Sequence, residues 1–183
     1  MRTHSRSLVR LLLLFIASVC GVARAAYYTA DTSAYVASTY PWIDISSTGT
    51  VISMGDDAVS SAISLGFTFN YGGTNYTTVK VQSNGMLQFG GTSTTYTNAQ
   101  LPLTGASGEP NIDAVMLPLW DDLFQSGNQL RYRTQGTAPN RVFIVSWNAV
   151  PFYCSGGTGC SASKQTTSLS ATFQVQIYEQ GQF

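Results

Sequence analysis

The sequence predicts an all-β fold, an antiparallel β-sandwich of two sheets. In several short stretches apolar residues alternate with polar ones, which is the two-residue period of a half-buried strand. Glycine, asparagine and proline separate these stretches, as expected for turns between antiparallel strands. Only 10% of the 183 residues are charged, whereas 44% are hydrophobic and 12% aromatic. A chain of this length and composition can bury one sizeable core.

A secretory signal peptide is predicted ahead of the strands, over residues 1–25. Basic residues precede the apolar run LLLLFIASVCGVA, and Ala23-Arg24-Ala25 has the small residues of a cleavage site. The apolar run is too short for the roughly 20 residues of a spanning helix. We therefore expect an exported chain with a single domain over residues 26–183 and no transmembrane span after cleavage. A lipoprotein leader processed at Cys20 is the alternative, although the preceding Val19 is bulky for one.

Removing this leader leaves an acidic domain without histidine. Four of the nine Lys and Arg residues and the single histidine, His4, lie within it, whereas all nine Asp and Glu residues follow it, so the net charge becomes 5 − 9 = −4. The mature part therefore lacks the histidine of a catalytic triad or of a histidine-ligated metal site. Five scattered basic residues also argue against nucleic-acid binding.

Two hairpins are predicted in the first half of the chain. The first strand has alternating apolar residues, and these are Leu65, Phe67 and Phe69. A turn at Gly72-Gly73 leads to a second strand, from Tyr76 to Ser83. Asn84-Gly85 then fits the positive φ angles of a type I′ turn. Residues 86–89 return as the third strand.

Three more strands are predicted in the second half. Residues 129–134 alternate, and residues 142–147 are nearly all apolar, which is typical of a central strand covered on both faces. Residues 172–178 alternate again, and the inward side chains are Phe173, Val175 and Ile177. Residues 112–124 have room for a helical turn, but Pro118 argues against a long helix.

The final residues, 178–183, have the pattern of a strand, a turn and the first residue of a partner strand. An unpaired last strand would expose a sheet edge. We therefore expect the chain to be the N-terminal fragment of a longer protein, with the last strand of the sandwich missing. The alternative is that the domain does not need this strand.

Five segments, taken in order, carry a family resemblance. They are GFTFNYGG, V-x-V-x-SNG-x-L-x-F, LPLWDDL, GTAPNRVFIVSW and TFQVQIYE. This order resembles the N-terminal domain of exported proteins of the mannose-sensitive haemagglutinin (MSHA) pilus biogenesis type (MshQ-like), and it is also similar to the nidogen-like extracellular domain. The chain departs from these relatives where it has Met54-Gly55-Asp56-Asp57 in place of cysteines, and at the absent final strand.

The resemblance covers about Tyr40 to the end and implies a surface or extracellular protein. It implies a role in adhesion or pilus assembly, with no settled enzymatic activity. The partners expected from it are an extracellular protein or glycan ligand and pilus or cell-surface components.

Cys154 and Cys160 remain after cleavage, in a C-x5-C spacing. Two cysteines in an exported protein predict a disulfide. Because the loop between them is short, its stabilisation should lie below the roughly 3 kcal/mol expected for a 15-residue loop.

Asp121 and Asp122 form the most suggestive acidic pair. Adjacent loop carboxylates can bind calcium, which prefers oxygen ligands. In extended backbone, however, neighbouring side chains point to opposite faces, and the pair would then serve a turn. Both interpretations stay open, and no cofactor other than calcium is expected. Asp56-Asp57 is a weaker pair of the same kind. A glycosidase would need two carboxylates across a cleft, and no motif singles out such a pair.

Four aromatic residues are candidate ligand contacts: Phe152 and Tyr153 beside the cysteine loop, and Tyr71 and Tyr76 at the first turn. Packing is the alternative for each of them. The leading interpretation is a non-catalytic exported module for adhesion or pilus-associated assembly. The second is a carbohydrate-binding module attached to a downstream enzyme. Neither interpretation makes this chain itself an enzyme.

Overall fold

The computed structural model describes residues 41–101, 103, 112–155, 160–161 and 166–183, without the side chains of residues 160, 161 and 166–168. This part of the chain contains strands and no helix. The strands are β1 (Thr50–Val51), β2 (Ile63–Tyr71), β3 (Thr74–Gln82), β4 (Met86–Gln88), β5 (Val115–Met116), β6 (Leu130–Gln135), β7 (Val142–Tyr153), β8 (Cys160–Ser161) and β9 (Thr166–Tyr178). Among these residues, none belongs to a helix with the length and apolarity needed to cross a membrane.

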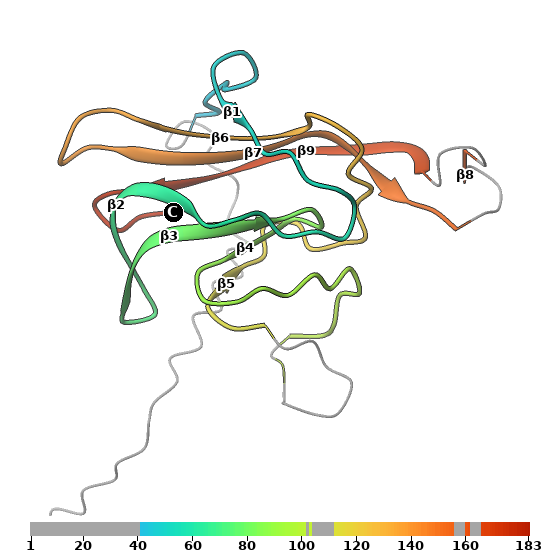
Figure 1. Ribbon diagram of the computed structural model, residues 1–183, viewed down its shortest axis with the longest axis horizontal. Helices are drawn as coiled ribbons and strands as arrows, with labels where there is room; N and C mark the ends of the chain where they lie inside the picture. The colour runs from blue at the N-terminus through green and yellow to red at the C-terminus, as the bar shows by residue number, and fades with distance from the viewer. Residues whose placement is uncertain (1–40, 102, 104–111, 156–159, 162–165) are drawn as a thin grey trace, which may run out of the picture. The chain divides into compact units, whose positions relative to one another are not determined.

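The strands form two antiparallel sheets, which confirms the predicted sandwich. The larger sheet has the order β1-β6-β7-β9-β8, and the smaller has the order β2-β3-β4-β5. Figure 1 shows them as two layers, with β6, β7 and β9 in one and β2 to β5 in the other. Each sheet contributes its inner face to one shared core.

The core contains four residues that the alternation predicted to face inward, Leu65, Phe67, Phe69 and Ile177, whereas the other two, Phe173 and Val175, are partly buried against it. From the smaller sheet come Leu65, Phe67, Phe69, Val79, Val81 and Leu87; from the larger sheet come Leu130, Phe143, Val145, Trp147 and Ile177. Trp147 is fully buried, and its ring stacks on Phe173 with the centroids 4.8 Å apart. The central strand β7 is covered on its outer face as well. There Ile45 packs with Val142 and Ile144 in a second apolar cluster.

Strand β2 contains a wide bulge. Ser64 pairs with Thr78 and Phe69 pairs with Tyr76, so the residues 65–68 lie opposite Thr77 alone. Gly66, at φ +84°, makes the bend within this bulge.

The turn between β3 and β4 differs from the predicted type I′ hairpin. Gln82 pairs with Met86, so the loop has three residues, Ser83, Asn84 and Gly85. The Gly85 N–H donates to the Gln82 carbonyl at 3.3 Å, and Gly85 has a φ of +78°, whereas Asn84 is not among the positive-φ residues. This is the three-residue type of hairpin loop, in which the last loop residue, here Gly85, has a positive φ. Asn84, in the middle of this loop, is fully buried.

Two strands are longer than the sequence pattern predicted. β7 extends six residues beyond Trp147, to Tyr153, and β9 begins at Thr166. Register shifts near Val150 and Pro151 break the alternation, which hides the extension of β7 in the sequence. Phe152 and Tyr153 are therefore strand residues and not loop residues. Residues 112–124 contain β5 and no helical turn.

Candidate functional site

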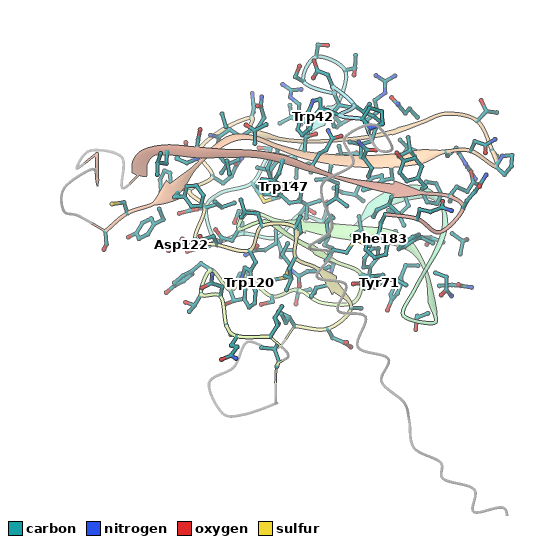
Figure 2. All side chains as sticks on the ribbon, turned by 180° about the vertical axis from the view of Figure 1, so that it is seen from behind. Trp42, Tyr71, Trp120, Asp122, Trp147 and Phe183 are labelled. Atoms are coloured by element: carbon teal, nitrogen blue, oxygen red, sulfur yellow. The ribbon has the colours of Figure 1, made fainter. Side chains whose placement is uncertain are left out.

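Four aspartates gather where β7 ends, and this group of Asp56, Asp57, Asp121 and Asp122 is called the acidic end here. They come from two segments that are 64 positions or more apart in the sequence. Figure 2 shows Asp122 on the side of the sandwich opposite to Tyr71 and Phe183. The sequence offered each pair separately, and the fold brings the two pairs together.

Asn84 holds these two segments in place. Its side chain is fully buried. The amide nitrogen Nδ2 donates to Oδ1 of Asp57 at 2.8 Å, and the amide oxygen Oδ1 accepts from the Leu123 N–H at 2.8 Å. The β3–β4 turn thus links the Asp57 loop to the segment that carries Asp121 and Asp122. A buried amide that is satisfied on both sides rigidifies its surroundings.

A second contact joins the same two segments. The backbone N–H of Gln125 donates to Oδ1 of Asp56 at 3.1 Å. Gln125 is 3% exposed, and among the described residues its side-chain oxygen Oε1 has no hydrogen-bond partner. This leaves one buried oxygen acceptor without a donor in the segment that follows the acidic pair.

The acidic end carries unbalanced negative charge. Partial burial, followed by the charges of Asp57, Asp56 and Asp121, raises the pKa of Asp122 to about 6. The pKa of Asp56 is also raised, chiefly by burial, although the Gln125 N–H opposes the shift. In the part of the chain that the structure describes, the ion pair is Arg141–Glu179, which does not involve these aspartates.

The acidic end is not a preassembled metal cage. Among the described residues, no three His, Cys, Asp or Glu side chains are grouped so that they could hold a metal ion. Oδ1 of Asp121 accepts the backbone N–H of Asp122 at 2.8 Å, which is turn chemistry. The carboxylate of Asp121 is thus partly engaged, whereas the side chain of Asp122 makes no hydrogen bond to another described residue.

One of the predicted aromatic contacts lies at the acidic end. The Tyr153 N–H donates to the Asp122 carbonyl at 2.8 Å, and the Tyr153 ring stacks on Phe124 at 6.4 Å between centroids. Both rings are half-buried. Phe152, in contrast, is partly buried against the core and pairs with Leu123. Sequence reasoning missed Phe124, although it lies only two residues after Asp122.

Tyr71 and Tyr76 lie away from the acidic end, beside Phe89 (Figure 2 labels Tyr71). The Tyr71 ring stacks on Phe89 at 4.9 Å, and the Tyr76 ring lies 5.2 Å from it. The Tyr71 hydroxyl donates to the Val115 carbonyl at 2.7 Å, and burial raises its pKa. Both tyrosines pack against the core, so the structure does not unite them with Tyr153 in one site.

Of the predicted disulfide Cys154–Cys160, the structure describes Cys154 and only the backbone of Cys160. Cys154 is not a free thiol. Residues 156–159 and the side chain of Cys160 lie outside the described residues, so the pairing of Cys154 with Cys160 stays a prediction. The proposed leader, residues 1–25, also lies outside them.

The comparisons with known proteins found one family. A family model described as NIDO related matches residues 28–182. This match supports the nidogen-like part of the resemblance and indicates an extracellular type of domain. The comparison with curated proteins and the comparison with solved structures each found no match.

Proposed function

The chain belongs to the NIDO-related family, and from this premise we propose that it is a non-catalytic exported module for adhesion or pilus-associated assembly. Its partners would be an extracellular protein or glycan and the components of a pilus or cell surface. The link to pilus biogenesis depends on the order of sequence segments alone. The family match supports an extracellular module more broadly.

The observation that carries this proposal is the acidic end. Hydrogen bonds of Asn84 to Asp57 and to the Leu123 N–H, and of the Gln125 N–H to Asp56, join its two segments. Among the described residues, however, no cation lies beside the aspartates. Gathered like charges destabilise a fold unless something else balances them. A contact surface for a cation or a basic partner supplies that balance, whereas a purely structural turn does not need four carboxylates.

We propose calcium as the cation. Carboxylates and the unpartnered Oε1 of Gln125 are oxygen donors of the kind that calcium prefers. Because the aspartates do not form a complete cage, the partner or water would supply the remaining ligands. A site of this kind would bind weakly, in the range of about 10⁻⁴–10⁻³ M that is typical of extracellular modules.

The adhesion proposal is tested by coating beads with residues 26–183 and measuring their retention by cells of the organism that makes the protein. Retention should require calcium and should be lost in the variant Asp121→Asn/Asp122→Asn. The variant Asp113→Asn, in which the substituted aspartate is exposed and lies outside the acidic end, is the matched control. Equal retention of the double variant would refute a role for the acidic end.

The second candidate is a carbohydrate-binding module attached to a downstream enzyme. The stacked, half-buried rings of Tyr153 and Phe124 favour it, since such rings offer a face to a sugar. Binding to a glycan panel that is lost in Tyr153→Ala, while the acidic-end variant still binds, would favour this candidate over adhesion through the aspartates. Phe152→Ala is a less clean test, because Phe152 also packs against the core.

Export and the cysteine bridge belong to the same proposal. Expression of the full chain in an exporting host should give a product that begins after Ala25. Non-reducing peptide mapping should then join Cys154 to Cys160. A product that retains its leader inside the cell would contradict the exported location.

A further inference from the structure

A shallow pocket lies over the bulge of β2, away from the acidic end. It has a volume of about 540 Å³, within the range of about 300–1,000 Å³ that is usual for small-ligand sites. Its lining includes three hydroxyl side chains, one ion pair and one aromatic ring: Ser64, Thr68, Thr77, Arg141, Glu179 and Phe67. We call it the bulge pocket.

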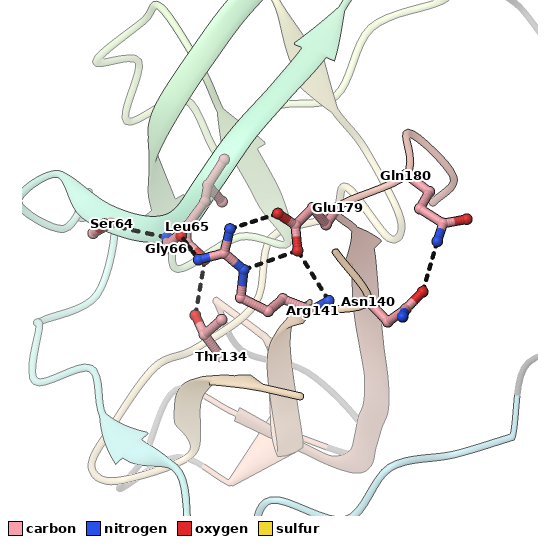
Figure 3. A network of polar contacts seen from close by, with 8 residues as sticks. All are labelled: Ser64, Leu65, Gly66, Thr134, Asn140, Arg141, Glu179 and Gln180. Carbon is pink, nitrogen blue, oxygen red and sulfur yellow. Dashed lines mark hydrogen bonds and ion pairs between the residues drawn. The ribbon is translucent and has the colours of Figure 1, made fainter. Parts of the chain in front are cut away.

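The ion pair in this pocket is held rigidly (Figure 3). Arg141 Nε donates to Oε2 of Glu179 at 2.8 Å, and the second guanidinium nitrogen Nη2 donates to Oε1. The third nitrogen, Nη1, donates to the carbonyl of Gly66 in the bulge. The guanidinium also lies 5.7 Å from the centroid of the Phe67 ring. Such a bidentate, stacked arginine keeps a fixed orientation.

This geometry leaves hydrogen-bonding capacity facing the pocket. A guanidinium has five N–H donors, and the bonds to Glu179 and Gly66 use three of them. Arg141 and Glu179 remain 30% and 17% exposed at their side chains. Ser64 Oγ accepts the Gly66 N–H at 3.2 Å, and its hydroxyl proton stays available. Thr68 and Thr77 are exposed and add two more hydroxyls.

The charge of the pocket selects the ligand class. The carboxylate of Glu179 neutralises Arg141, so an anion such as phosphate would meet a carboxylate at once. A neutral ligand that both donates and accepts many hydrogen bonds fits the lining better. From this we propose that the bulge pocket binds one sugar residue of a neutral glycan. This site is separate from the acidic end and does not depend on calcium.

The test is an NMR titration of residues 26–183 with a panel of neutral mono- and disaccharides, and with inorganic phosphate. The sugars should shift the backbone amides of Thr68 and Thr77 and the Nε–H of Arg141, and phosphate should not. Thr77→Val keeps a β-branched side chain and removes one hydroxyl. Loss of one hydrogen bond, about 1 kcal/mol, should weaken sugar binding roughly 5-fold.

Thr74→Val is the matched control, because Thr74 is an exposed threonine of the same strand that does not line the bulge pocket. It should bind as the wild type does, and both variants should unfold at the wild-type temperature. The variant Asp121→Asn/Asp122→Asn should also keep sugar binding, which separates this site from the acidic end. Absence of shifts with every neutral sugar, or shifts with phosphate alone, would overturn the proposal.

Discussion

Gly85 shows how one residue fixes the position of the acidic pair. A Cβ atom at this position would lie 1.8 Å from the carbonyl oxygen of Leu119, and the backbone has a φ of +78°. The β3–β4 turn therefore touches the segment that leads into Asp121. Only glycine permits this approach.

Gly85→Ala should therefore destabilise the fold more than most glycine-to-alanine substitutions in this chain. Backbone must move to relieve the overlap, and we expect a loss of about 2 kcal/mol or more in the free energy of unfolding. Urea unfolding measures it. Gly90→Ala is the control, since nothing lies within 4 Å of its Cβ position, and it should stay within about 0.5 kcal/mol of the wild type. Equal effects of the two would contradict the close approach.

Asp122 should make the free energy of unfolding decrease as the pH rises. Its pKa is about 6 in the folded chain and near 3.8 in the unfolded chain. Between these values the folded state binds more protons, so stability falls as pH rises from 3.8 to about 6 and is then constant.

Asp122→Asn removes this effect. At neutral pH the variant should gain less than about 1 kcal/mol in the free energy of unfolding, because solvent screens a carboxylate that is only partly buried. The gain should disappear below pH 3.8, where the wild-type carboxyl is protonated in both states. Denaturant unfolding at several pH values checks this. A variant less stable than the wild type at neutral pH would show that the carboxylate has a favourable partner.

At the scale of elements, the sequence predicted the strands that keep a simple period. Residues 63–71 alternate buried and exposed without exception up to Asn70. Val142–Trp147 was correctly expected to be covered on both faces, and a second cluster with Ile45 covers it. In these strands burial alone decides the pattern.

Other elements depend on contacts that are distant in the sequence. The last part of β7 contains register shifts, so its residues do not alternate. Asn84 was interpreted as a turn residue, and its bonds to Asp57 and Leu123 reach across 27 and 39 positions. The acidic end was therefore recognisable only as two separate pairs, because tertiary packing creates the group.

The Arg141–Glu179 pair joins elements from both sheets. It links the start of β7 and the turn after β9 to the bulge of β2. The hydrogen bond from Arg141 lowers the pKa of Glu179 below 4.5. The charged carboxylate therefore stabilises the fold above this pH, and the contribution is lost as pH falls through the folded pKa.

Glu179→Gln should lower the melting temperature at neutral pH. The difference from the wild type should shrink in acid, since the wild-type carboxyl also becomes neutral there. Thermal unfolding at a series of pH values measures the difference. Gln180→Ala, next to Glu179 and exposed, should show no such convergence. A constant difference at all pH values would mean that the carboxylate charge of Glu179 is not what stabilises the fold.

At the scale of the whole molecule, the sandwich separates a packed aromatic region from the acidic end. Phe69, Tyr71 and Phe89 stack with one another on one side. Asp122 of the acidic end lies on the opposite side (Figure 2), where its carbonyl accepts the N–H of Tyr153 at the end of β7. The shared core stabilises both regions, and the acidic end is where we propose that the module binds a cation.

The most direct test is thermal unfolding of residues 26–183 with calcium or with a chelator. At a calcium concentration ten times the dissociation constant, binding stabilises the fold by about 1.4 kcal/mol, which raises the melting temperature by roughly 3–6 °C. We expect this rise in the wild type and in Asp113→Asn, and its absence in Asp121→Asn/Asp122→Asn. An unchanged melting temperature of the wild type in about 10 mM calcium, ten times the weakest dissociation constant proposed, or an equal rise in the double variant, would contradict the account.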